Sequence, residues 1–225
     1  MFFLLDKLRP TATGLDQIPA WFLRLAAAVI YQPLTRLFNL SISTGTVPWQ
    51  WKQAIIRPVP KVAAPTKQAD FRPISIMPVL TRLMERTVVS RFLYPVFLTP
   101  PSTLAFHDQF GFRPTGCTTA ALVYTLHAIT SLLSTNPFVI VIALDFSKAF
   151  DTVRHSTLLH KIAQLEIPEN VYNWLLDFLQ GQSHCREYNG QSSAYAKSLL
   201  VSYKDPPSVR PCTLSRQLTY LGYLV

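Results

Sequence analysis

Two carboxylates, Asp145 and Asp151, follow the most apolar stretch of the chain. Residues 138–145 read FVIVIALD, so an apolar run ends directly in an acid. A carboxylate at the mouth of a rigid strand is well placed to hold Mg²⁺, which prefers hard oxygen ligands. One carboxylate rarely suffices, so a second acid would have to come from elsewhere in the fold. These residues alone equally allow a turn at the strand end, with Asp151 capping a following helix.

The segments before this strand combine helices with one hairpin. Apolar residues recur at three and four positions over 20–43 and predict a helix, which Gly45 and Pro48 end. Two short β-rich runs, 51–61 and 71–76, flank a basic loop and predict a hairpin over 51–76. The prolines in 51–61 favour an edge strand. Residues 78–97 predict a helix that carries Arg82, Arg86 and Arg91.

Later segments continue the mixed pattern. A helix is expected from Thr118 or Thr119, either of which could cap it, to about Ser134. After the strand at 138–145, helices are expected over 155–165 and 168–180, and a short hairpin around Asn189-Gly190. This order, without a regular alternation of strands and helices, predicts an α+β fold.

The charge is strongly basic and unevenly placed. The formal net charge is +9, and residues 1–137 carry 13 lysines and arginines against 5 acids. This imbalance favours nucleic acid as a partner, although an ordinary solvated basic surface is the alternative. Three cysteines with no zinc-ligand spacing predict reduced thiols in an intracellular protein. No apolar run is long enough to span a membrane, and MFFLL is too short for a signal peptide.

Four blocks of the sequence share their order and spacing with one family. The blocks are PLTRLFNLSISTGTVPWQWKQAIIRPVPK, DFRPISIMPVLTRLMERTVVSRF, DQFGFRPTGCTTAALVYTLH and VIALDFSKAFDTVRHSTLLHKIAQL. Together they resemble the reverse transcriptases of non-LTR retrotransposons, LINE-type and jockey-like. The resemblance covers roughly residues 14–195 and implies the fingers and a partial palm of a right-hand polymerase.

The resemblance also implies a division of the chain into parts. Residues 1–13 would be an N-terminal tail, and 14–137 a fingers-like region with a basic hairpin and helices. Residues 138–195 would be a partial palm with the first catalytic strand. Residues 196–225 would be an aberrant tail.

Catalytic and metal-binding roles follow from the same resemblance. Asp145 resembles the acid that binds two Mg²⁺ ions, and the backbone carbonyl of Phe146 resembles a further ligand. Phe150 resembles the aromatic gate that excludes the ribose 2′-hydroxyl and favours deoxynucleotides. The implied chemistry is attack of a primer 3′-hydroxyl on the α-phosphate of a deoxynucleotide.

Substrate contacts are implied on the fingers side. Lys61 and Arg72 resemble residues that touch the triphosphate, as a point charge and a bidentate fork; each could instead be a surface cation. Gln109, Phe110 and Arg113 resemble residues that contact template and primer, although Phe110 could equally belong to the core. The implied partners are an RNA template, a DNA primer and deoxynucleotides, with no obvious protein partner.

The resemblance stops at about Leu199. The family carries a second catalytic Asp-Asp block and a Gln-Gly-Ser block, and neither occurs here. Reading the third base of each codon with the first two of the next allows Gln-Gly-Ser across residues 203–206, so we expect a one-base frameshift near Leu199. We therefore expect the chain alone to be inactive. The alternatives to an enzyme fragment are a non-catalytic RNA- or DNA-binding remnant and a pseudogene product.

Overall fold

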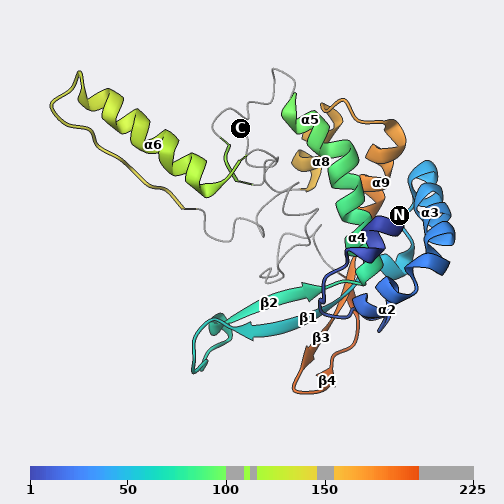
Figure 1. The fold of residues 1–225 in the computed structure, drawn as a ribbon. Coiled ribbons are helices and arrows are strands. Elements are labelled where there is room, and N and C mark those ends of the chain that lie inside the picture. The colour runs from blue at the N-terminus through green and yellow to red at the C-terminus, as the bar shows by residue number, and fades with distance from the viewer. Residues whose placement is uncertain (100–108, 112–115, 146–154, 198–225) are drawn as a thin grey trace.

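The computed structural model describes residues 1–99, 109–111, 116–145 and 155–197. Figure 1 shows helices gathered on one side, a twisted sheet below them, and a projecting helix, α6. The α-helices are α1 (Phe2–Asp6), α2 (Ala20–Leu25), α3 (Ala27–Thr44), α4 (Val79–Val88), α5 (Tyr94–Leu98), α6 (Thr118–Leu133), α8 (His155–Ala163) and α9 (Glu169–Leu179). The shorter helical turns are η1 (Trp49–Lys52), η2 (Gln68–Asp70) and the π-turn η3 (Val89–Leu93). The strands are β1 (Gln53–Pro60), β2 (Phe71–Ile76), β3 (Ser183–Tyr188), β4 (Gln191–Ser192) and β5 (Ala196–Lys197).

The sheet has the strand order β2-β1-β3-β4, and β5 also pairs with β3. Strands β1 and β2 form the expected antiparallel hairpin, whereas β1 and β3 are parallel and pair Gln53 with Ser183. The predicted turn at Asn189-Gly190 joins β3 to β4, and both residues have positive φ, as a two-residue type I′ turn requires. The mixed helix and sheet content agrees with the α+β prediction.

The expectation that 51–61 would be an edge strand is wrong, because β1 lies between β2 and β3. Residues Gln53 to Ile56 pair with β3, and of these Ile55 and Ile56 pair with β2 as well. The second half pairs only with β2, so that part of the strand keeps one open edge. The prolines that suggested an edge lie in this second half.

The register explains how the hairpin tolerates its prolines. The backbone N–H of Lys61 donates to the carbonyl of Asp70 at 2.7 Å, which makes them a hydrogen-bonded pair. Bonded and non-bonded pairs alternate along an antiparallel ladder. Counting back from Lys61, Pro58 and Pro73 face each other at a non-bonded position, and Pro60 occupies another. None of the three therefore removes a hydrogen bond from the β1–β2 ladder.

One main core holds the helices together. Its buried residues come from the N-terminal helices, from α4 to α5, and from α8 and α9; its fully buried members include Leu5, Leu93, Ile162, Trp174 and Leu175. Residues 1–13, expected to be a tail, therefore contribute a helix and the buried Leu5 to the core. The predicted boundary at 137/138 does not divide this core, because helices from both sides pack in it.

Two expected helices differ in detail. The helix predicted over 20–43 is interrupted at Ala26, which ends α2 and begins α3. The apolar recurrence runs through the break because both helices bury a face in the same core. Helix α6 is capped by Cys117, whose Sγ accepts a hydrogen bond from the Ala120 N–H at 3.3 Å, and not by Thr118 or Thr119.

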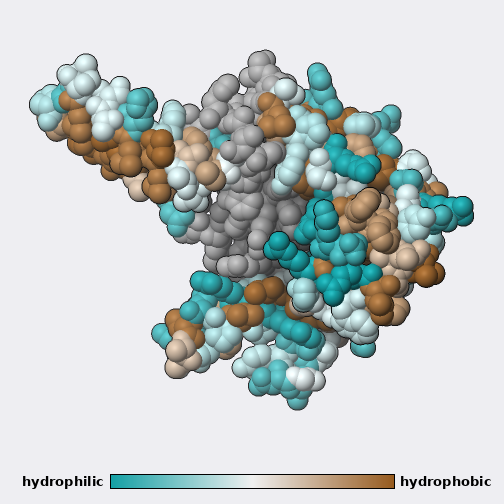
Figure 2. Space-filling view, in the orientation of Figure 1, coloured by the Kyte–Doolittle hydropathy of each residue, from teal (hydrophilic) through white to brown (hydrophobic). Residues whose placement is uncertain are grey.

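Residues 138–145 do not form the expected strand. They follow α6 without any regular hydrogen-bonded structure, and Ile140, Ile142 and Leu144 are 77%, 77% and 88% exposed. We call residues 118–145 the α6 arm; Figure 2 shows hydrophobic residues gathered along it. A strand exists only where another strand satisfies its backbone groups, and within the described sheet β1 pairs with β2 and β3 instead.

Candidate nucleotide and nucleic-acid site

The tip of the β1–β2 hairpin is fixed by backbone hydrogen bonds. One carboxylate oxygen of Asp70 accepts from the N–H groups of Thr66 and Lys67, each at 2.9 Å. These bonds stabilise the ionised form and hold the pKa of Asp70 below its usual value. The ammonium group of Lys61 donates to the Ala69 carbonyl at 2.7 Å. These bonds therefore hold the loop between β1 and β2 in a closed conformation.

Lys61 and Arg72 lie on the same face of this hairpin. Val59 is directly opposite Arg72 in the register, so these two side chains share a face. Side chains two residues apart in an extended chain point to the same side, which places Lys61 with Val59 and Arg72. Both cations are exposed. The pairing therefore brings together two residues that are 11 positions apart in sequence.

A third cation, Arg57, shares this face and was not singled out by the sequence. It precedes Lys61 by four residues, an even spacing that alternation along a strand could have revealed. Its guanidinium Nη2 donates to both carboxylate oxygens of Glu187, at 2.9 and 3.1 Å. Glu187 comes from β3, so only the β1–β3 pairing could have shown this contact. We call Arg57, Lys61 and Arg72 the cationic face of the hairpin.

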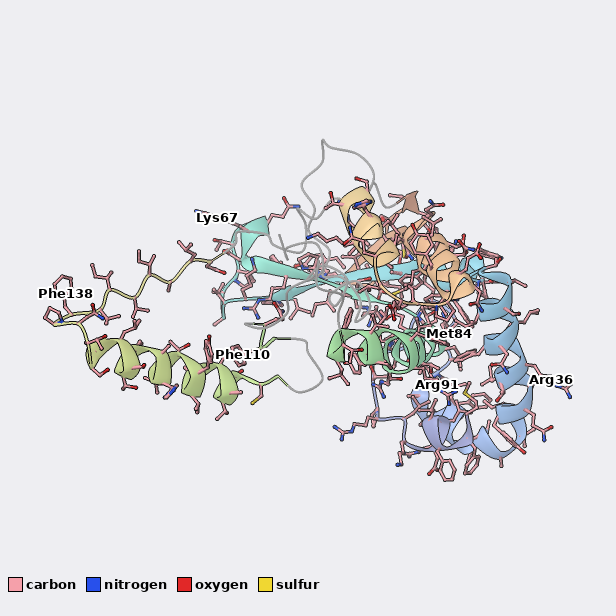
Figure 3. All side chains as sticks on the ribbon, turned by 90° about the horizontal axis from the view of Figure 1, so that it is seen from above. Arg36, Lys67, Met84, Arg91, Phe110 and Phe138 are labelled. Atoms are coloured by element: carbon pink, nitrogen blue, oxygen red, sulfur yellow. The ribbon has the colours of Figure 1, made fainter. Side chains whose placement is uncertain are left out.

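The proposed template residues lie in a different segment. Gln109 donates from its amide Nε2 to the Gly111 carbonyl at 2.8 Å, and the ring of Phe110 lies 5.4 Å from that of Tyr124 on α6. Phe110 therefore packs at the base of the α6 arm. Figure 3 shows Phe110 and Phe138 at opposite ends of this arm, and the hairpin tip at Lys67 directed to the same side of the molecule.

The close passage of the chain at Gly116 fixes this base. A Cβ added at Gly116 would lie 2.1 Å from the Phe110 carbonyl oxygen, so any other residue would force the backbone apart. The close approach of the Phe110 carbonyl thus explains why residue 116 of the GFRPTG motif is a glycine. Arg113 lies outside the described residues.

The proposed metal ligand Asp145 is exposed at the end of the α6 arm. Phe146 and Phe150 lie outside the described residues. Within the described ranges, no group of three or more histidines, cysteines or acids is arranged to hold a metal ion. The hairpin register therefore brings Lys61 and Arg72 to one face, whereas Asp145 belongs to no such group of three within the described ranges.

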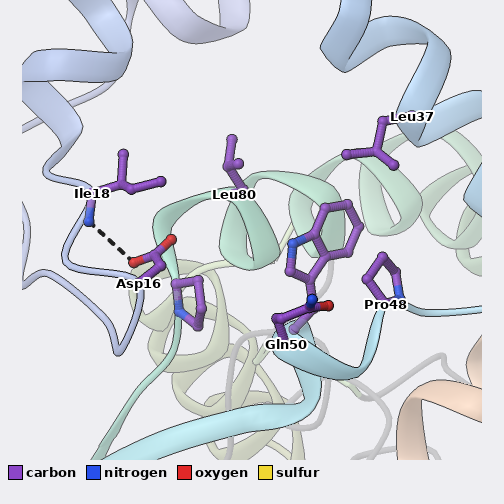
Figure 4. Close-up of a pocket in the computed structure, with 8 residues that line it drawn as sticks. Asp16, Ile18, Leu37, Pro48, Gln50 and Leu80 are labelled. Atoms are coloured by element: carbon purple, nitrogen blue, oxygen red, sulfur yellow. Dashed lines mark hydrogen bonds between the residues drawn. The ribbon is translucent and has the colours of Figure 1, made fainter.

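A separate apolar pocket of about 380 Å³ is lined by none of the candidate site residues that the sequence suggested. It is lined by the segment after α1, by α3, by η1 and by the start of α4: Asp16, Ile18, Leu37, Pro48, Gln50, Trp51, Pro78 and Leu80. Figure 4 shows the Asp16 carboxylate turned toward the Ile18 N–H, which donates to it at 3.3 Å. Asp16 is the one charged residue among those that line the pocket, and one of its carboxylate oxygens is already hydrogen-bonded to the backbone.

Residues 59–201 match the sequence model of the family described as reverse transcriptase, RNA-dependent DNA polymerase. The chain is 30% identical over 156 residues to a probable RNA-directed DNA polymerase from transposon X-element of Drosophila melanogaster, covering 69% of this chain and 16% of the relative. It is 29% identical over 184 residues to the RNA-directed DNA polymerase from mobile element jockey of the same species, covering 81% and 20%. A third relative, a Pol polyprotein from a type-1 retrotransposable element R2 of Popillia japonica, is 29% identical over 169 residues, covering 74% and 22%.

The chain thus spans about a fifth of the length of these relatives. Among the described residues, no helix combines the length and the apolar character needed to cross a membrane. The family match covers more than half of the chain and includes Lys61, Arg72, the α6 arm and β3. On this evidence, the chain belongs to the reverse transcriptase family and corresponds to a segment of the RNA-directed DNA polymerase of non-LTR retrotransposons.

Proposed function

We propose that the chain is the fingers and partial palm of an RNA-directed DNA polymerase that acts on an RNA template, a DNA primer and deoxynucleotides. The observation that carries this proposal is the hairpin register, which gathers Lys61 and Arg72 on one exposed face. A lysine offers a point charge and an arginine a bidentate fork, and both suit phosphate oxygens. In this proposal the two residues contact the triphosphate, and Gln109, Phe110 and Arg113 contact template and primer.

The family's Mg²⁺ chemistry is only partly supported by the residues of this chain. The carboxylate of Asp145 and the carbonyl of Phe146 are suitable hard oxygen ligands. A two-metal site needs further acids, and Asp145 belongs to no group of three or more potential metal ligands within the described ranges. The sequence also contains no second Asp-Asp block. We therefore propose that the 225 residues bind substrates without polymerising them, and we assign no catalytic step to the metal.

A frameshift near Leu199 remains our explanation for the missing blocks. The family match ends at residue 201, close to the point where the resemblance was expected to stop. Residues 196–225 would then be an aberrant tail, and Phe150 would keep its role only in a repaired chain. The second candidate function, a non-catalytic RNA- or DNA-binding remnant, is favoured by the absence of an Asp-Asp block from the sequence.

Binding to a labelled RNA template–DNA primer duplex, followed by fluorescence anisotropy, tests the proposal. We expect binding at low salt that weakens steeply as salt rises, because phosphate contacts release counterions. A deoxynucleoside triphosphate should compete for the cationic face, and Lys61→Ala or Arg72→Ala should weaken that competition. Arg36→Ala on α3 is the control, since Arg36 lies far from the hairpin tip in Figure 3. Folded chain that binds no duplex at low salt would refute the proposal.

A further inference from the structure

The ion pair between Arg57 and Glu187 joins the cationic face to β3. The Arg57 Nη2 lies 2.9 and 3.1 Å from the two carboxylate oxygens, and the two side chains are 45% and 30% exposed. Arg57 follows Ile56, which pairs with Arg186, so Arg57 and Glu187 occupy adjacent positions on neighbouring parallel strands. The carboxylate of Glu187 is therefore paired with a guanidinium that remains accessible to solvent.

The position of Arg57 makes it a neighbour of the proposed phosphate-binding residues. Ile74 lies directly opposite Arg57, and Arg72 precedes Ile74 by two residues in β2, on the same face. Diagonal neighbours of this kind lie roughly 7–8 Å apart in an antiparallel pair, within reach of arginine side chains. One ligand carrying several phosphates could contact Arg57, Arg72 and Lys61 together.

A carboxylate and a phosphate compete for the same features of a guanidinium. Both offer paired oxygens that accept hydrogen bonds from its planar donors, and phosphate is a strong partner in such bidentate contacts. Exposed ion pairs hold weakly because water and salt screen them. A phosphate that also contacts the two neighbouring cations should therefore bind Arg57 more strongly than the Glu187 carboxylate does, and should displace it.

We propose that Arg57 is a third phosphate-binding residue of the hairpin, and that Glu187 occupies it until a phosphate displaces the carboxylate. This inference rests on the proposed function, because it assumes that the cationic face meets phosphates. The phosphate belongs either to the nucleic-acid backbone or to the triphosphate. Glu187 acts through Arg57 and lowers the affinity of the free protein for both kinds of ligand.

The test measures duplex binding by the full chain across a salt series. Arg57→Gln should weaken binding and reduce the slope of log affinity against log salt by about 0.7–0.9, the value of one phosphate contact. Glu187→Gln should strengthen binding by about two- to five-fold, the range for one exposed ion pair. In the double variant the gain from Glu187→Gln should vanish, because the two residues act as one unit.

Matched controls separate this effect from general electrostatics. Glu166→Gln makes the same change of charge at another exposed acid, and Arg36→Gln removes an exposed cation on α3. We expect smaller changes from both, and unchanged thermal melting for all four single variants. Competition by inorganic tripolyphosphate distinguishes the two sources of phosphate. If tripolyphosphate competes less well for the Arg57→Gln variant than for wild type, Arg57 binds the triphosphate. If the salt slope of duplex binding changes instead, Arg57 binds the nucleic-acid backbone.

Opposite signs for the two variants are the decisive result. If the ion pair only braces β1 against β3, both variants should weaken binding and lower the melting temperature. That outcome overturns the inference, as does an Arg57→Gln variant that matches Arg36→Gln in both slope and tripolyphosphate competition. Folded wild-type chain that binds no duplex would instead refute the proposed function itself.

Discussion

The indole N–H of Trp174 donates a hydrogen bond to the hydroxyl of Ser41 at 2.9 Å, across the buried contact between α9 and α3. Ser41 in turn donates to the Thr46 carbonyl at 2.6 Å, just after α3 ends at Gly45. The Trp174 ring also stacks on Phe178, with ring centroids 5.2 Å apart. This chain of contacts ties a helix of the proposed palm to a helix of the proposed fingers.

Removing the Ser41 hydroxyl should destabilise the fold. Ser41→Ala leaves the Trp174 N–H buried without its acceptor, and an unsatisfied buried group costs about 1–3 kcal/mol. We expect urea denaturation to show a lower free energy of unfolding by that amount. Ser43→Ala is the control, because Ser43 is exposed and bonds only within its own helix; its effect should stay within about 0.5 kcal/mol. Equal effects of the two substitutions would contradict the role of the buried bond.

A second contact of the same kind fixes the end of α9. Asp177 accepts a hydrogen bond from the Val47 N–H at 2.7 Å and pairs with the Lys52 ammonium at 2.7 Å. Asp177→Ala should lower the free energy of unfolding by about 1.5–3 kcal/mol, the range for hydrogen bonds to a charged group. Asp177→Asn should cost less, because an amide oxygen can still accept from Val47. Thermal and urea unfolding of both variants would check this order.

The hairpin tip should loosen in acid. The N–H groups of Lys67 and Thr66 lower the pKa of Asp70 below its ordinary value of 3.8. A depressed pKa in the folded state means that the stabilisation is complete above the unfolded value and is lost as pH falls through the folded value. We therefore expect the Lys67 and Thr66 amide resonances to change only below about pH 4. Asp70→Asn should remove this pH dependence, and a carboxyl titrating at or above 3.8 would contradict it.

Local sequence signals were sufficient for most individual elements. Two short β-rich runs and their prolines located the hairpin, Gly45 marked the end of α3, and Asn189-Gly190 located the β3–β4 turn because few residues adopt positive φ. What the sequence did not reveal depends on contacts distant along the chain. The parallel pairing of β1 with β3 joins residues 130 positions apart and turned the expected edge strand into an internal one.

The candidate site could be predicted from the sequence only where its geometry depends on residues close together in the chain. Lys61 and Arg72 were named from the family resemblance, and the register of one local hairpin gathers them on one face; their contact with the triphosphate stays a prediction. Glu187 was missed because its contact with Arg57 exists only after β3 docks. At 138–145 the sequence predicted a strand that the structure does not contain. The apolar composition of these residues is that of a strand buried on both faces, yet composition cannot supply the neighbouring strands.

The exposed end of the α6 arm should limit solubility. Ile140, Ile142 and Leu144 are all more than 75% exposed, and an unpaired apolar segment is an aggregation site. Ile142→Lys should raise the soluble fraction and shift the chain toward monomer in analytical ultracentrifugation, without lowering the melting temperature. Ile162→Lys is the contrasting substitution, because Ile162 is fully buried in the main core. An Ile142→Lys variant that melts as early as Ile162→Lys would show that Ile142 is buried in solution.

Purified chain with Mg²⁺, primer–template and deoxynucleotides should extend no primer above background, because one carboxylate leaves the metals short of ligands. A chain repaired by restoring the shifted frame near codon 199, and continued through an Asp-Asp turn, should extend the primer.

Within that repaired chain, two substitutions should separate catalysis from nucleotide selection. Asp145→Asn should abolish extension, since a neutral amide binds Mg²⁺ far less well than a carboxylate. Phe150→Ala should retain part of the deoxynucleotide extension and admit ribonucleotides, because it removes the ring that would clash with a 2′-hydroxyl. Duplex binding should persist in both variants, which assigns the losses to chemistry and selection and not to substrate affinity. Extension by the 225-residue chain itself, or genomic DNA whose shifted frame does not read Gln-Gly-Ser across codons 203–206, would refute the explanation.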